Sequence, residues 1–196
     1  TLELSGDWRY RFVSDSGKSD EARLTVYKKG FATPDWAKGR VMYQIFPDRF
    51  GFGDCAQGIE YHRSLGQTPE LHGSIADPVR WQARSFESDY SPDDFYGGTL
   101  DGIRKKLPYL RSLGVGIIYL NPAVEARSNP RYDCSDYTKV DPILGSVEDY
   151  VNLCADAKRL GIAVISDGVF SHTGADSVYF NRYGSYPSLG AWQSEG

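Results

Sequence analysis

The sequence predicts an α/β fold in which parallel strands are joined by helical crossovers, preceded by the end of an antiparallel β module. Short, near-continuous apolar runs of the kind found in buried parallel strands occur at 41–46, 115–120 and 162–166. Segments with apolar residues at helical spacing separate these runs. The first 36 residues instead alternate apolar and polar positions, as half-buried antiparallel strands do.

The first 36 residues are typical of the last part of an antiparallel β module. Two alternating segments, 8–13 and 22–27, are predicted strands, and the polar stretch 14–21 between them is a predicted turn. Two strands are too few for an independently stable domain. We therefore expect that the module begins before this chain does, and that a linker leads into the α/β domain at 37–196.

The α/β domain opens with the predicted strand 41–46, and a long polar stretch without regular pattern follows at about 51–98. Residues 100–114 then have helical spacing and end in glycine, a common C-terminal stop. Pro108 lies inside this helix, where its missing N–H predicts a kink or a break.

The second crossover has the same form. The strand 115–120 leads through a loop to a helix at 146–161, where Ser146 and Asp149 have capping-box spacing with Asp in place of Glu. The strand 162–166 follows directly. A doubly wound sheet and a (β/α) barrel both fit this order, and both build their sites at the carboxyl ends of the strands.

Composition and charge narrow the classes of function. A net charge of -4 without a basic stripe predicts no nucleic-acid partner. No apolar run is long enough for a membrane span, and the N-terminus has no signal-peptide core, which predicts a cytoplasmic protein, with secretion as the alternative. Fourteen Tyr suit sugar ligands and an aromatic core equally well. No strand is followed by a nucleotide-binding glycine motif.

The three cysteines show no metal-binding spacing. Cys55 and Cys134 lie in predicted loops and are able to pair, although nothing in the sequence requires a disulfide there. Cys154 falls on the apolar rhythm of the second predicted helix, which indicates a small core residue. The odd number of cysteines favours a reducing compartment.

Two polar clusters near the strand ends are explained most simply by structure. Asp48 and Arg49 follow the first buried strand, and we predict a salt bridge that fixes the loop there. Gly97 and Gly98 precede the first helix, where Thr99 is placed to cap it. Ligand contact is the weaker interpretation for both clusters.

Two further clusters are candidate sites. Tyr132 and Asp133, on the loop after the second strand, combine a stacking face with a hydroxyl acceptor. Asp167 follows the third strand directly, and His172 lies on the next loop. Such a pair can hold a sugar hydroxyl, ligate a metal or transfer protons; the alternative is that Asp167 binds backbone amides and His172 packs at the rim. The residues leave these interpretations open, although only three histidines make zinc the weaker one.

Taken together, four segments resemble the α-amylase family of glycoside hydrolases, and look most like its neopullulanase, cyclomaltodextrinase and amylopullulanase-like members. They follow the family's order: MYQIFPDRF, FYGGTLDGIRKKLPYLRSLGVGIIYLNP, RYDCSDYTKVDPILGS and SDGVFSHTG. The resemblance covers residues 34–196 and implies the first three strands of an eight-stranded (β/α) barrel. It implies that the earlier residues end an N-terminal β-sandwich, and that the substrate is an α-glucan.

The resemblance also assigns roles to the candidate residues. It implies that His172 bonds hydroxyls of the sugar in the cleavage subsite and that Tyr132 stacks on that same sugar. It implies that Asp167 supports the site from beneath and that Asp133 shapes the loop. The family's retaining chemistry uses an Asp nucleophile and a Glu acid/base that follow later strands. No catalytic residue is therefore expected in this chain, and the fragment alone is expected to be inactive.

No cofactor is implied, and two departures weaken the calcium sites that relatives carry. Ser171 stands where many members have a calcium-binding Asn, and Thr99 stands where neopullulanase-like members have an Asp. The same motifs also fit a transglycosylase or phosphorylase of the family, or a non-catalytic barrel like those of amino-acid transporter subunits. Because neopullulanase-like relatives often dimerise, a homodimer is a further expectation.

Overall fold

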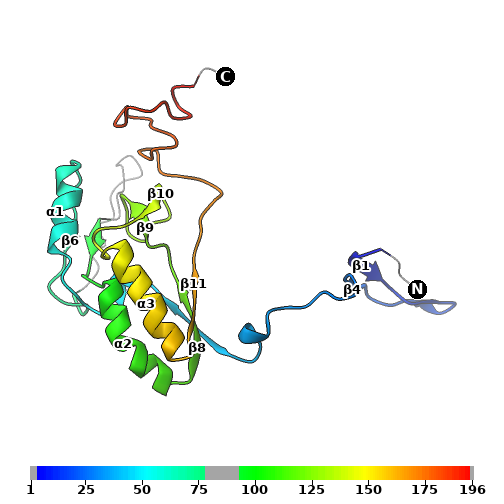
Figure 1. Cartoon of the computed structure of the whole chain (residues 1–196). Helices are drawn as coiled ribbons and strands as arrows, with labels where there is room; N and C mark the ends of the chain where they lie inside the picture. Colours follow the sequence, from blue (N-terminus) through cyan, green and yellow to red (C-terminus); the bar gives the residue numbers. More distant parts are fainter. Residues whose placement is uncertain (1–3, 78–92, 195–196) are drawn as a thin grey trace. The chain divides into compact units, whose positions relative to one another are not determined.

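The computed structural model describes residues 4–77 and 93–194, so the part of the predicted irregular stretch at 78–92 lies outside the described residues. The chain divides into two compact units, Thr1–Gly39 and Arg40–Gly196. Figure 1 colours the chain along its sequence. Among the described helices, none combines the length and the apolar character that a membrane crossing requires.

The first unit is a small antiparallel arrangement. Strand β1 (Gly6–Tyr10) pairs along its length with β4 (Ala22–Val26), which confirms the two predicted strands at slightly different bounds. At the predicted turn, β2 (Val13–Ser14), which begins with the last residue of the first predicted strand, and β3 (Gly17–Lys18) form a further short ladder. The side chains of β1 and β4 are exposed or half-buried, because two strands without a covering layer cannot build a core.

The second unit is built on a parallel sheet. Its strands β5 (Val41–Ile45), β8 (Val115–Leu120) and β11 (Ala163–Ser166) match the three predicted buried strands. They lie in the order β11–β8–β5, so strands that are consecutive among these three pair in parallel with one another. In the described residues this sheet has three strands and does not close into a barrel.

Two helices lie side by side on one face of this sheet (Figure 1). Helix α2 (Leu100–Ser112) is capped by the Thr99 hydroxyl, and α3 (Val147–Arg159) begins with the predicted capping box of Ser146 and Asp149. Their apolar stripes bury against the sheet, and this burial is the main stabilising contribution to the unit. The buried side chains of this core include Ile45, Leu100, Ile103, Leu107, Leu110, Ile118, Leu120 and Leu153.

Pro108 lies within α2, and the helix continues through it. Proline cannot donate an N–H to the carbonyl four residues earlier, which weakens a helix interior. Its neighbours Leu107 and Leu110 are fully buried, and their packing holds the helix together across the missing hydrogen bond. The predicted break at this position is therefore wrong.

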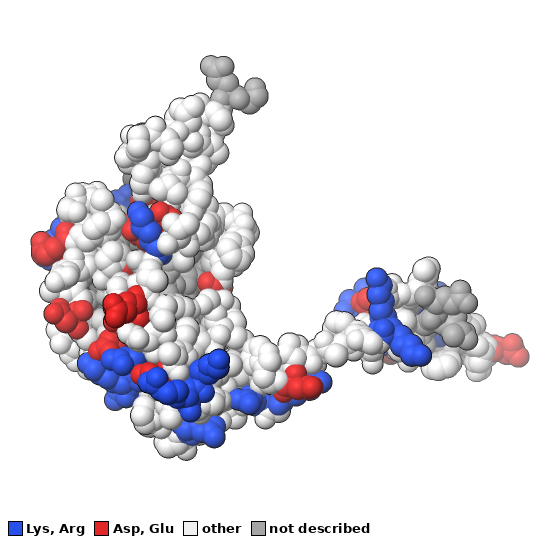
Figure 2. All heavy atoms as spheres, viewed as in Figure 1, with Lys and Arg blue, Asp and Glu red and all other residues white. Residues whose placement is uncertain are grey.

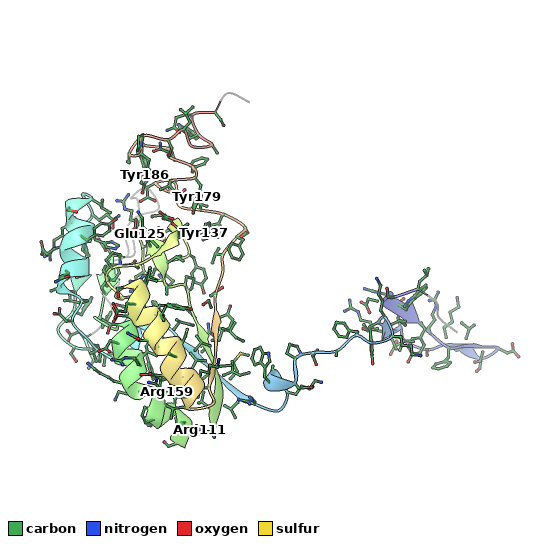
Figure 3. All side chains as sticks on the ribbon, in the orientation of Figure 1. Arg111, Glu125, Tyr137, Arg159, Tyr179 and Tyr186 are labelled. Carbon is green, nitrogen blue, oxygen red and sulfur yellow. The ribbon has the colours of Figure 1, made fainter. Side chains whose placement is uncertain are left out.

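Figure 2 shows Lys and Arg side chains gathered over the C-terminal ends of α2 and α3. Arg111 and Arg159, labelled in Figure 3, lie in the last turns, where the helix dipole favours positive charge. Arg104 reaches from α2 to Asp156 of α3 at 3.2 Å. This ion pair is partly exposed, so it adds little to the free energy of unfolding.

The predicted irregular stretch contains a helix. Helix α1 (Ala56–Ser64) buries Ile59 against Cys55 and Phe95 in a second small core. Cys55, Ile59 and the buried His62 stand at helical spacing, so the signal of one helical face is present in the sequence. The absence of regular pattern that we predicted for this segment is therefore wrong.

Two pairs of strands lie in segments predicted as loops. Strand β6 (Glu70–Leu71) pairs in parallel with β7 (Asp94–Phe95), and β9 (Val124–Ala126) pairs antiparallel with β10 (Cys134–Val140). The β9–β10 ladder contains register shifts, so its sequence lacks the even alternation that predicts a strand. Cys134 consequently begins a strand rather than lying in a loop.

The cysteines are free thiols, so the pairing of Cys55 with Cys134 that the sequence left open does not form. Both side chains are buried. Burial raises the pKa of the Cys134 thiol to about 12, which keeps it protonated and unreactive near neutral pH.

A buried carboxylate, Asp48, joins three loops. It follows β5 in a 3-10 turn and accepts the backbone N–H of Tyr96 at 3.0 Å and the Asn129 amide at 2.7 Å. Arg49 pairs with it at 3.0 Å, which confirms the predicted salt bridge. Gly98 packs so closely that an added Cβ would overlap the backbone of the same turn. The loop after β5, the loop between β9 and β10, and the entry to α2 are thereby fixed to one another.

A second buried network begins at Asn129. The guanidinium of Arg131 is buried and donates to Asn129 at 3.1 Å and to Asp141 at 2.8 Å. The other oxygen of Asp141 bonds a ring nitrogen of His62 at 3.1 Å, and Gln67 bonds the second ring nitrogen at 2.6 Å. This network joins α1 to the loops around β10.

The charges of this network set one another's pKa. Burial acts to raise the pKa of the Asp141 carboxyl, but Arg131 and His62 outweigh it, so the pKa lies below its ordinary value. Burial acts to lower the pKa of His62, but the hydrogen bond and charge of Asp141 outweigh it, so that pKa is raised. The fold therefore favours a charged pair.

We predict that Arg131→Met lowers the free energy of unfolding by about 3–5 kcal/mol, because Asp141 would stay buried without its cation. Urea unfolding followed by circular dichroism measures this change. The matched control is Arg127→Met, since Arg127 is exposed and forms no ion pair within the described residues. The control should shift stability by no more than about 0.5 kcal/mol. Equal effects of the two substitutions would contradict the role of the buried pair.

We predict that stability falls as the pH rises above neutrality. The unfolded pKa of His62 is about 6.5 and the folded pKa lies above it. Its contribution is therefore complete below about pH 6.5 and is lost as the pH rises through the raised pKa. Unfolding midpoints in urea between about pH 6 and 9 measure this trend, and His62→Gln should flatten it. A slope unchanged in that variant would assign the trend to other groups.

Candidate functional site

The carboxyl ends of three strands meet at one edge of the parallel sheet. Asn121 follows β8 and donates its backbone N–H to Ile45 of β5, and Asp167 follows β11 and donates its own to Leu120. The Gln44 side chain donates to that of Asn121 at 2.7 Å. Polar side chains from the three strands therefore line one edge, where parallel α/β domains build their sites.

The fold brings two of the predicted site residues together. The Tyr132 hydroxyl donates to Asp167 Oδ2 at 3.2 Å. Burial, and then the Asp167 carboxylate, raises the pKa of both Tyr132 and Tyr119 on β8. Among the described residues the Asp167 carboxylate thus receives a phenol rather than the backbone amides of the alternative interpretation.

Two pockets open beside Asp167. One, of about 280 Å³, lies between the end of β8, β10 and the start of α3, and the other, of about 260 Å³, lies between β10 and the loop after β11. Ser166, Asp167 and Tyr137 line both pockets, together with Val124. A few polar groups set among apolar side chains are what a ligand with flat apolar faces and polar edges requires.

His172 lies on the loop after β11 with its side chain exposed. Its Nδ1 bonds the Ser171 hydroxyl at 3.1 Å, and within the described parts of the chain it makes no hydrogen bond to Tyr132 or Asp167. The alternative interpretation required the ring to pack at the rim, and the exposed ring does not do so. It is instead accessible to a ligand.

Tyr137 of β10 fixes the loop that carries His172. Its hydroxyl contacts the backbone carbonyl of Val169 and lies 2.8 Å from that of His172. Its ring packs against Tyr179, with centroids 5.3 Å apart, and Figure 3 labels both side chains. Sequence reasoning missed this residue, although it lies in the same segment as Tyr132.

The position of Tyr132 is set by the residue before it. Arg131 has a φ of 73°, a left-handed conformation that costs a non-glycine residue roughly 1–3 kcal/mol. Its buried guanidinium is bound to Asp141 and Asn129, and these bonds hold the strained backbone in place. Tyr132 is consequently presented half-exposed beside Asp167.

Asp133 lies on the same loop but is turned toward the loop itself. Its carboxylate accepts both the backbone N–H and the hydroxyl of Ser128. It lines neither of the pockets beside Asp167. This placement is that of a residue that shapes the loop around Tyr132.

The two positions that bear on calcium make other contacts. The Thr99 hydroxyl accepts the N–H of Gly102 at 3.0 Å as the cap of α2, and the Ser171 hydroxyl faces His172. Within residues 4–77 and 93–194, no group of three or more His, Cys, Asp or Glu side chains is arranged to hold a metal ion.

The chain is similar to known proteins along most of its length. Residues 44–193 match the family model of the alpha-amylase catalytic domain. The chain is 50% identical over 87% of its length to an amylopullulanase of Thermoanaerobacterium saccharolyticum, and 37% identical over 74% to neopullulanase 2 of Thermoactinomyces vulgaris. It spans 14% and 21% of those two proteins, respectively.

Solved structures show the same similarity. The type III pullulan hydrolase of Thermococcus kodakarensis aligns with a TM-score of 0.63 at 28% identity, over 89% of this chain and 32% of that one. A cyclic α-maltosyl-(1→6)-maltose hydrolase of Arthrobacter globiformis, in complex with that sugar, aligns with a TM-score of 0.57 at 33% identity. That alignment covers 76% of this chain and 29% of the hydrolase.

We predict that Tyr137→Phe loosens the loop after β11. The variant keeps the ring but loses the hydroxyl between two backbone carbonyls, which should lower stability by about 1 kcal/mol. The backbone N–H of Gly174, which donates to Cys134 in the wild type, should then exchange its hydrogen faster. Tyr109→Phe is the control, because Tyr109 is exposed on α2. Unchanged exchange at Gly174 would show that the hydroxyl does not hold this loop.

Proposed function

Because the chain belongs to the alpha-amylase family, we propose that the protein containing it is a retaining glycoside hydrolase. Its substrates are α-glucosidic bonds of starch-like glucans, pullulan or cyclodextrins. The observation that carries this proposal is the pairing of Tyr132 with Asp167 beside two pockets at the strand ends. The relatives named above, an amylopullulanase and a neopullulanase, support the substrate class.

In this proposal the three parallel strands are the first three of a (β/α)8 barrel. Strands β5, β8 and β11 lie in chain order, and both crossover helices cover one face, as in a barrel wall. The opposite face would then line the barrel interior. The family's Asp nucleophile and Glu acid/base belong to later strands, so the residues of this chain bind the sugar rather than attack it.

The binding roles follow from the chemistry of each group. The Tyr132 ring offers a flat apolar face against which a sugar ring can stack, and its hydroxyl is already held by Asp167. Asp167 therefore orients the stacking residue and does not transfer the proton. The exposed His172 ring can exchange hydrogen bonds with sugar hydroxyls. No metal enters the proposal, since Thr99 and Ser171 are engaged elsewhere.

The experiment is a hydrolysis assay of the protein that contains this chain, on pullulan, maltooligosaccharides and cyclodextrins. We expect Tyr132→Ala to lower kcat/KM by about tenfold or more, because a misplaced sugar loses alignment for the reaction. Tyr132→Phe should cost less, since the stacking face remains. Tyr109→Phe should have no effect, because that side chain is exposed on α2.

Two outcomes would contradict the proposal. One is hydrolysis by the purified 196-residue chain, because the catalytic Asp and Glu would then lie within it. The other is full activity of Tyr132→Ala at low substrate concentration. Product analysis with an acceptor sugar or with phosphate separates hydrolysis from transglycosylation and phosphorolysis. No reaction on any α-glucan would favour a non-catalytic barrel.

A further inference from the structure

A third pocket, of about 250 Å³, lies away from Asp167 and shares no lining residue with the two pockets described above. It is formed where β9, β10 and the end of α1 meet the C-terminal segment. That segment is attached to β10 by two backbone hydrogen bonds, from Gly174 to Cys134 at 2.9 Å and from Val178 to Ser135 at 3.0 Å. The walls of this pocket are therefore held together by backbone hydrogen bonds of the second unit.

Two polar side chains in this pocket are almost completely buried. Glu125 is 4% exposed, and one oxygen accepts the Tyr61 hydroxyl at 3.1 Å. Ser135 is 6% exposed and lines the same pocket. The pocket is thus lined by a carboxylate that accepts hydrogen bonds and a hydroxyl that can donate or accept them.

The remaining wall combines charge with aromatic surface. Asp176 and Arg127 lie on it, and neither forms an ion pair within the described parts of the chain. Tyr186 is half-buried and Tyr183 is exposed. Burial, then the Glu125 and Asp176 carboxylates, raises the pKa of Tyr186, so its hydroxyl stays a donor near neutral pH. Figure 3 labels Glu125 and Tyr186 at this end of the unit.

These groups select a class of ligand. The two carboxylates of the pocket, Glu125 and Asp176, are matched by Arg127 and His62, so the lining favours neither an anion nor a cation. Acceptors, donors and a phenol ring in one small cavity match a neutral ring that carries several hydroxyls. We propose that this pocket binds one pyranose unit of an oligosaccharide, with Glu125 and Ser135 bonding its hydroxyls and Tyr186 covering its face.

That the pyranose belongs to an α-glucan rests on the proposed function. The pocket would hold a strand of substrate away from the cleavage subsite. Because its lining residues are separate from those around Asp167, each site can be removed without the other.

The test is calorimetric titration of the 196-residue chain with maltotriose. We expect binding to persist in Tyr132→Ala, which removes the stacking residue of the strand-end site. Glu125→Gln should weaken the persisting binding about tenfold or more, because a bond to a charged group is lost. Tyr186→Ala should weaken it as well. Ser135→Ala gives a smaller loss and removes no charge.

Circular dichroism and the thermal midpoint of each variant show that the fold is kept. Should Glu125→Gln unfold, Ser135→Ala and Tyr186→Ala, which leave the carboxylate in place, still decide the matter. The proposal is overturned if maltotriose does not bind, if Tyr132→Ala abolishes all binding, or if the pocket variants bind as the wild type does. Hydrolysis without this binding would overturn the inference alone, and binding without hydrolysis would overturn the proposed function alone.

Discussion

The rest of the second unit depends on one buried polar network, in which Asn129 joins two carboxylates. Its amide donates to Asp48, and its carbonyl oxygen accepts from Arg131, which in turn holds Asp141. Together with the bond between His62 and Asp141, these contacts connect the loop after β5, the loop between β9 and β10, and helix α1. A buried carboxylate must be matched by donors, so the loops cannot move independently without leaving a charge unpaired. Irregular backbone therefore behaves here as part of the rigid framework.

This framework explains how site residues that lie on loops can still have fixed positions. The left-handed backbone at Arg131 is unfavourable by itself, and it persists because the guanidinium is bound at 2.8 Å to Asp141. Tyr132, the next residue, is thereby aimed at Asp167 across the strand ends. Tyr137 fixes the loop after β11, because its hydroxyl bonds a backbone carbonyl of that loop. A residue of the buried network thus positions a site residue that is next to it in the chain.

The three strands of the parallel sheet and the helices α2 and α3 could be predicted because their signals are local. The three apolar runs mark the buried strands, and the apolar spacing in the two helices marks their buried faces. The caps at Thr99 and Ser146 are formed by residues that are close in the sequence, so they can also be recognised there. The strands β9 and β10 were missed because register shifts break their alternation. The bond between His62 and Asp141 joins positions 79 residues apart, and no local pattern reports such a contact.

The β9–β10 hairpin also shows why residue type alone left the site open. Neighbouring residues on a strand point to opposite sides, so Val124 lines the pockets beside Asp167 while Glu125 lines the third pocket. On β10, Cys134 and Ser135 are divided in the same way. One short hairpin thus forms a wall of both kinds of pocket.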